Sequence, residues 1–258
     1  MLLPASAATA GASSRSFAAD HPWDRNFHLA LLALAWLGIL MGFGGDIAEH
    51  LSKHRPPYPV IVHVHGVVFM GWLVLFTVQI LLVRQRKLGL HRRLGAGMAW
   101  VAACMLFLGP ATALHMQHLR AGQPDAEPAF LSIQFTDLLA FAGLITAGLL
   151  RRKAPAAHKR LMFLGTLYIT DAGFARWLGD ALSAVFGSGP VGFWFSLYAP
   201  TVVLMLLLGG YDLVTRRRLH PTYVAGLAWV LACQLTALLL YYSPWWADCA
   251  KKIIARAW

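Results

Sequence analysis

Seven apolar segments take up most of this 258-residue chain. A helix needs roughly 20 residues to cross the hydrocarbon core of a bilayer. Unpaired backbone polar groups are intolerable in lipid, and the segments are too long and too uniformly apolar for the strands of a barrel. The sequence therefore predicts an all-α polytopic membrane protein with about seven transmembrane helices. They lie at about 28–46, 59–83, 93–116, 129–150, 160–183, 192–212 and 222–242.

The composition agrees with lipid as the surrounding solvent. Hydrophobic residues make up 58% of the chain and charged residues only 13%, whereas a soluble domain has roughly 25% charged residues. The net charge of +11 comes from Lys and Arg in short connections between apolar segments rather than on one amphipathic face. This distribution predicts contact with anionic phospholipid headgroups and not with nucleic acid. The three cysteines show no metal-binding spacing, so neither a disulfide nor a thiolate metal site is expected.

The basic connections also predict the orientation of the chain. They follow the second, fourth and sixth segments, while the other connections are nearly neutral. The positive-inside rule then places the N-terminus in the cytoplasm and the C-terminus in the periplasm of a bacterial inner membrane. Three parts are predicted: a disordered Ala- and Ser-rich tail at 1–26, a transmembrane domain at 27–243 and an interfacial segment at 244–258.

An internal repeat follows from the basic connections. HisArgArgLeu at 91–94 aligns with HisLysArgLeu at 158–161, and AlaGlyMetAlaTrpVal at 96–101 aligns with AlaGlyLeuAlaTrpVal at 225–230. The pattern predicts one helix followed by three parallel-repeated helical hairpins, with a histidine at the cytoplasmic start of each second helix. Lipid phosphate binding and anchoring of the helix starts are expected for the residues of these motifs, namely His91, Arg92, Arg93, His158, Lys159, Arg160 and His220.

Ionisable residues inside apolar segments are the best pointers to a site, because they are costly in lipid. Asp137, Asp171 and Arg176 lie in the middle or outer half of their segments. They are predicted to bind a substrate or a proton in the bundle interior. Alternatively, Asp137 and Arg176 neutralise each other, and Asp171 is then the protonatable group.

Two cofactor sites are also considered near the outer side. Asp46, Glu49 and His50 have the i, i+3, i+4 spacing that places three metal ligands on one helix face, although a solvated helix end has the same pattern. His65 and His115 belong to neighbouring helices and are candidate axial ligands of haem b. The cofactor expectation is therefore haem b or a divalent metal.

Several motifs together resemble a family of uncharacterised bacterial multi-pass inner-membrane proteins. They are HisValHisGly at 63–66, HisArgArgLeuGly at 91–95, HisLysArgLeuMet at 158–162 and AlaArgTrp at 175–177, within a match of roughly residues 60–180. A looser similarity to b-type membrane cytochromes does not extend to the histidine spacing. The leading hypothesis is a redox-associated protein with haem or a metal in an outer polar cavity. A small-solute or proton-coupled carrier and a structural subunit are the alternatives, and the sequence leaves open whether the protein is an enzyme.

Overall fold

The computed structural model of the chain is helical throughout its regular elements. It describes residues 17–18 and 20–257, so most of the predicted tail at 1–26 lies outside the described residues. The helices of this part are α1 (Asp24–Ser52), α2 (Val60–Arg84), α3 (Leu88–Arg120), the 3-10 turn η1 (Pro128–Phe130), α4 (Leu131–Leu150), α5 (Pro155–Tyr168), α6 (Asp171–Phe186), α7 (Pro190–Arg216), α8 (Pro221–Tyr241) and α9 (Pro244–Arg256).

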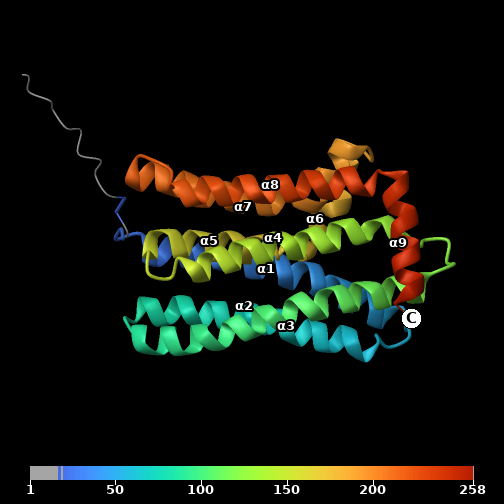
Figure 1. Ribbon diagram of the computed structural model, residues 1–258, viewed down its shortest axis with the longest axis horizontal. Coiled ribbons are helices and arrows are strands. Elements are labelled where there is room, and N and C mark those ends of the chain that lie inside the picture. The colour runs from blue at the N-terminus through green and yellow to red at the C-terminus, as the bar shows by residue number, and fades with distance from the viewer. Residues whose placement is uncertain (1–16, 19, 258) are drawn as a thin grey trace, which may run out of the picture.

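The long helices run side by side along the longest axis of the molecule (Figure 1). Six of them are long and apolar enough to cross a membrane: α1, α2, α3, η1 with α4, α7 and α8. The prediction of an all-α polytopic membrane protein is thus confirmed. The described N-terminal residues lie at the end that holds the α2–α3, α4–α5 and α7–α8 connections, which we call the basic end. The C-terminus lies at the opposite end.

The predicted single helix at 160–183 is wrong, because α5 ends at Tyr168 and α6 begins at Asp171. The hydroxyl of Thr170 donates to the carbonyl of Leu167 at 2.6 Å, and the Asp171 carboxylate accepts from the main-chain N–H of Ala172 at 2.6 Å. Short polar side chains of this kind compete with the backbone hydrogen bonds of a helix. The break therefore follows from the local sequence ThrAsp, and neither half alone reaches the roughly 20 residues of a membrane-crossing helix.

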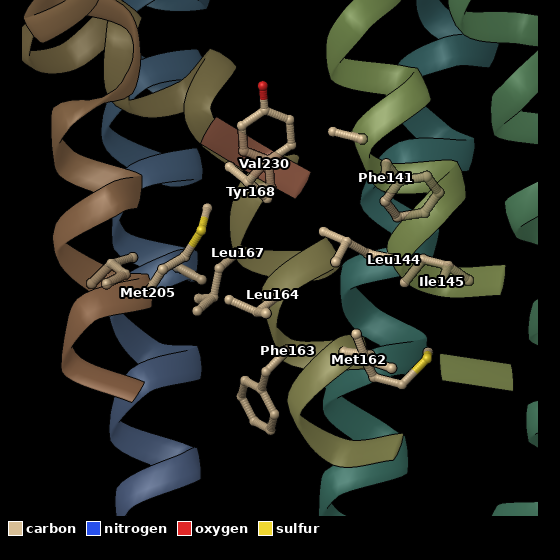
Figure 2. Close-up of a cluster of buried hydrophobic side chains, with 14 of the residues drawn as sticks. Phe141, Leu144, Ile145, Met162, Phe163, Leu164, Leu167, Tyr168, Met205 and Val230 are labelled. Atoms are coloured by element: carbon tan, nitrogen blue, oxygen red, sulfur yellow. The ribbon is translucent and has the colours of Figure 1, made fainter. Parts of the chain in front are cut away.

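Apolar side chains from α4, α7 and α8 pack around α5 and hold it in the interior (Figure 2). Leu164 and Leu167 extend from α5 on the side of Met205 of α7. Tyr168 stands at the end of this core, fully buried, with its hydroxyl directed away from Leu164. Because α5 is buried on all sides, the hydroxyl of its last residue, Tyr168, lies in the interior next to the helix break. The rest of the core around α5 comes from Phe141, Leu144, Ile145 and Val230.

Glycines bring α1 into close contact with α6. A Cβ atom on Gly42 would collide with the carbonyl oxygen of Gly173, and a Cβ on Gly173 would lie 2.7 Å from the carbonyl oxygen of Gly38. Gly38 and Gly42 are one helical turn apart, the small-xxx-small spacing that lets membrane helices approach closely. This contact fixes the first turn of α6, and with it Asp171, against α1.

The C-terminal segment predicted at 244–258 forms a helix over most of its length. In Figure 1, α9 lies across the end of the bundle opposite the basic end. Trp246 donates its indole N–H to the carbonyl of Ala129 at 3.0 Å, and Ile254 is buried in a small apolar cluster with Leu131. The helix is therefore attached to the start of α4, while its place at a membrane interface stays a prediction.

Candidate functional site

Two carboxyl groups meet at the break between α5 and α6. Asp171 is the first residue of α6, and its side chain lies within hydrogen-bonding reach of the carboxyl group of Asp137 on α4. Only 6% of Asp171 is exposed, and Asp137 is partly buried. The helix break thus places one carboxyl group directly against another in the interior of the bundle. We call Asp137 and Asp171 the carboxyl pair.

Two buried tyrosines complete the polar surroundings of the carboxyl pair. The hydroxyl of Tyr168, at the end of α5, donates to Oδ1 of Asp137 at 2.8 Å. The hydroxyl of Tyr198 on α7 donates to the same oxygen at 3.4 Å. The two rings are stacked with their centres 6.2 Å apart, and both residues are fully buried. Three helices, α4, α5 and α7, therefore converge on one carboxyl oxygen.

The carboxyl pair lies near the middle of the combined length of α5 and α6. With a rise of roughly 1.5 Å per residue, Asp171 is about 24 Å from the start of α5 and about 22 Å from the end of α6. In membrane transporters, binding sites near the bilayer midplane are commonly built at such interrupted helices. Carboxyl and phenol groups at this depth can hold a proton or a small hydrogen-bonding solute.

The expected neutralisation of Asp137 by Arg176 is wrong. The Arg176 guanidinium lies 3.7 Å from the carboxylate of Asp46 on α1 and 4.5 Å from the ring centre of Phe43. Arg176, Asp46 and Glu49 instead line a polar cavity of about 430 Å³ between α1 and α6. Sequence spacing did not predict this partner, because which neighbour Arg176 meets depends on how α6 packs against α1.

The predicted metal ligands on α1 do not form a ligand set. Glu49 accepts a hydrogen bond from Lys53 at 2.7 Å, while the ring of His50 stacks on Tyr58 with centres 4.0 Å apart. Asp46 faces Arg176. Within residues 17–18 and 20–257, no group of three or more His, Cys, Asp or Glu side chains is arranged to hold a metal ion. At this end of α1, the three residues with the i, i+3, i+4 spacing each contact a different partner instead of a shared metal ion.

The predicted haem ligands His65 and His115 lie on α2 and α3, which pack against each other. The His65 ring stacks on Phe69 with centres 4.0 Å apart, and its Nδ1 atom is buried without a hydrogen-bond partner. His115 is partly buried. A cofactor between the two histidines stays a prediction.

Five charged side chains form an ion cluster at the basic end. The Asp24 carboxylate accepts from Lys159 at 2.7 Å and from Arg216 at 2.8 Å. Arg160 donates two hydrogen bonds to Asp212, at 2.5 and 2.6 Å, and both side chains are 98% buried. Arg216 also lies 3.5 Å from Asp212. This basic-end cluster joins α1, α5 and α7.

Two of the residues expected to bind lipid phosphate therefore have internal partners. Lys159 and Arg160 extend toward carboxylates on α1 and α7, which already balance their charge. Arg92 and Arg93, which align with Lys159 and Arg160 in the sequence motifs, are exposed. Of these four cations, only the two at the start of α3 are exposed and remain candidates for binding lipid phosphate.

The three repeated histidines lie at the starts of α3, α5 and α8 but make different contacts. His220 caps α8, because its Nδ1 accepts from the main-chain N–H of Thr222 at 3.2 Å. Burial, assisted by the positive charge of Arg160, lowers the pKa of the His220 imidazole and so favours this neutral acceptor. His158 donates from Nδ1 to the carbonyl of Gly148 at 2.8 Å, and His91 lies beside it.

Four residues of these clusters were not predicted from the sequence. Tyr168 and Tyr198 carry no charge, so a search for ionisable residues in apolar segments passes over them. Asp24 falls in the predicted tail. Asp212 ends the segment predicted at 192–212, and its i, i+4 spacing to Arg216 is the signal that was available.

The carboxyl pair, its two phenol donors and the polar cavity at Arg176 together form the candidate site. All of its members come from α1, α4, α5, α6 and α7. Their approach depends on the interrupted α5–α6 segment and on the glycine contact with α1. Comparison of the chain with protein-family models, curated proteins and solved structures finds no match.

Proposed function

We propose that this protein is a proton-coupled carrier of the bacterial inner membrane, in which the carboxyl pair holds the transferred proton. The contact between Asp137 and Asp171 at the helix break carries the proposal. Carboxylates have only acceptors, so two carboxyl groups can hydrogen bond to each other only when one of them is protonated. Bringing them together in the bundle interior thus creates a place for a proton.

The surroundings of the carboxyl pair suit proton binding and release. Tyr168 and Tyr198 donate to Asp137 and stabilise a carboxylate there, which leaves Asp171 as the carboxyl group that gains and loses the proton. Losing the proton leaves two negative charges in contact, and their repulsion favours movement of the α6 end of the broken helix. A proton-dependent change in helix position is the basic step of a coupled carrier.

The polar cavity supplies the route from the outer side. Arg176 lies on α6 beyond Asp171, at the wall of the cavity with Asp46 and Glu49. Asp171 and Arg176 lie on the same helix, so α6 itself leads from the cavity wall to the carboxyl pair. In the proposed topology α5 and α6 together form a seventh crossing, the N-terminus is cytoplasmic and the cavity opens to the periplasm.

Replacing Asp171 with asparagine is expected to lower proton flux by about tenfold or more, because an amide cannot take up a proton at neutral pH. Purified full-length protein in liposomes with an internal pH-sensitive dye provides the measurement, with a potassium diffusion potential as the driving force. Asp180→Asn is the matched control, since Asp180 is an exposed carboxylate on the same helix. It should leave the flux unchanged.

Equal flux through the Asp171→Asn protein and the wild type would show that the carboxyl pair does not carry the proton. Wild-type flux no higher than in protein-free liposomes would reject the carrier proposal itself. Gel filtration and thermal unfolding of each variant in detergent separate these results from misfolding.

Haem or metal binding near His65 is a second candidate function, favoured by the buried Nδ1 atom that has no hydrogen-bond partner. An optical spectrum of the purified protein, oxidised and then reduced with dithionite, is expected to show a sharp reduced α-band that disappears in His65→Ala and His115→Ala. Elemental analysis covers the metal alternative. A protein without a chromophore and without stoichiometric metal would rule out this second function, and the carrier would be the single remaining proposal.

A further inference from the structure

Two of the three repeated histidines meet at the basic end, away from the carboxyl pair. His91 lies in the first turn of α3 and His158 in the first turn of α5. Their ring centres are 6.3 Å apart and their planes are nearly perpendicular, at 83°. Two imidazoles that bind one tetrahedral metal ion have ring centres roughly 5–5.5 Å apart, given metal–nitrogen bonds of about 2.0–2.1 Å. The observed separation is about 1 Å longer, so the two rings would move toward each other when they bind one ion.

Hydrogen bonds to the main chain determine which ring nitrogens are free. A carbonyl oxygen only accepts, so the 2.8 Å contact with Gly148 places a proton on Nδ1 of His158 and leaves Nε2 with a lone pair. The His91 ring lies close to the main chain of Gln79, and its Nδ1 atom is buried without a hydrogen-bond partner. Metal-bound histidines almost always donate their second N–H to a carbonyl or carboxylate in this manner.

A buried amide lies against α3, one helical turn from His91. Gln79 on α2 is 94% buried, and neither its side-chain oxygen nor its side-chain nitrogen has a hydrogen-bond partner. The amide nitrogen faces Gly95, at 3.5 Å from the position of a Cβ atom there, and Gly95 is one turn along α3 from His91. An unpartnered amide is costly in the interior of a membrane protein, so this arrangement indicates a missing polar ligand.

We propose that His91 and His158 bind a divalent transition-metal ion such as Zn²⁺, with Gln79 as a third polar group for the ion or for a water bound to it. Neutral imidazole is a preferred ligand of Zn²⁺, and the Gln79 carboxamide can hydrogen bond to a water that completes the coordination of the ion. The site is separate from the carboxyl pair and does not depend on the proposed carrier function.

The charge distribution around the two histidines permits a cation. The two cations that follow His158 on α5, Lys159 and Arg160, are paired with Asp24 and Asp212, while Arg92 and Arg93 are exposed. A phosphate group would need N–H donors, yet His158 gives its Nδ1–H to the main chain and presents a lone pair on Nε2. The ring geometry therefore favours a metal ion over an anion.

Zinc binding by the purified full-length protein, freed of any histidine tag, tests the proposal. Wild-type protein is expected to retain about one Zn²⁺ per chain after removal of free metal, and Co²⁺ should give visible absorption bands in the same site. His91→Ala and His158→Ala should each weaken zinc binding by about tenfold or more, and Gln79→Ala by less. His220→Ala is the matched control, because the His220 lone pair is already used to cap α8.

Binding that is equally strong in His91→Ala or His158→Ala would overturn the proposal, as would wild-type protein without stoichiometric zinc. His91→Gln keeps a polar side chain and serves as a second variant in case the alanine variants do not fold. Zinc should raise the unfolding temperature of the wild type but not of the variants that lose the site. A rise in unfolding temperature with inorganic phosphate but not with Zn²⁺, lost in the same variants, would assign the site to an anion instead.

Discussion

Asp212→Ala is expected to destabilise the protein by about 3–5 kcal/mol, the usual cost of removing one partner from a buried ion pair. Both Asp212 and Arg160 are 98% buried, and two hydrogen bonds join them. Without the carboxylate, the Arg160 guanidinium stays in the interior with an uncompensated charge. Arg216 loses its contact with Asp212 as well, although it keeps Asp24. Thermal unfolding in detergent measures the effect.

Asp125→Ala serves as the control, because Asp125 is exposed in the connection between α3 and α4. Its unfolding temperature should equal that of the wild type. Asp212→Asn keeps the shape and two hydrogen-bonding atoms but not the charge, so an intermediate loss is expected. Unfolding of Asp212→Ala at the wild-type temperature would mean that the buried ion pair contributes nothing to stability.

Gly42→Ala is expected to destabilise the packing of α1 on α6 by about 1–3 kcal/mol or more, the range for overpacking a close contact. The added methyl group would meet the carbonyl oxygen of Gly173, a main-chain atom that cannot rotate away. Because Gly173 follows Asp171 by two residues, displacement of α6 should also lower the proton flux. Unfolding temperature and liposome flux are measured on the same preparation.

Gly44→Ala is the matched control on the same helix, since a Cβ atom at Gly44 meets nothing within 4 Å. It should leave both unfolding temperature and flux at wild-type values. A Gly42→Ala protein as stable as Gly44→Ala would show that α1 and α6 are farther apart than the structure has them. Gly173→Ala approaches the same contact from the other helix and should reproduce the loss.

Both predictions concern the segment that carries the candidate site. The basic-end cluster holds the start of α5 through Lys159 and Arg160, and the glycine contact holds the start of α6. The break between the two helices is therefore fixed from both sides. A carrier that moves at this break would have to move against these contacts, so variants at these positions test whether stability and transport change together.

The sequence by itself determined the architecture. Apolar segments of bilayer length require helices, because lipid offers the backbone no hydrogen-bond partner. The same reasoning selected Asp137 and Asp171, since a carboxyl group in an apolar segment is costly wherever its helix packs. It also located the three histidines at helix starts, because their motifs follow the basic connections. These conclusions depend only on the cost of moving a residue from water into lipid.

Only the tertiary structure decided which of these residues meet. Arg176 pairs with Asp46 rather than Asp137, and Arg160 pairs with Asp212 rather than facing lipid phosphate. The break at 169–170, which brings Asp171 to Asp137, depends on side chains competing with backbone hydrogen bonds over a single turn. Hydropathy averages over such a turn, and it carries no information on the rotation of one helix against another. Partner choice is set by that rotation and by the glycines that allow close approach.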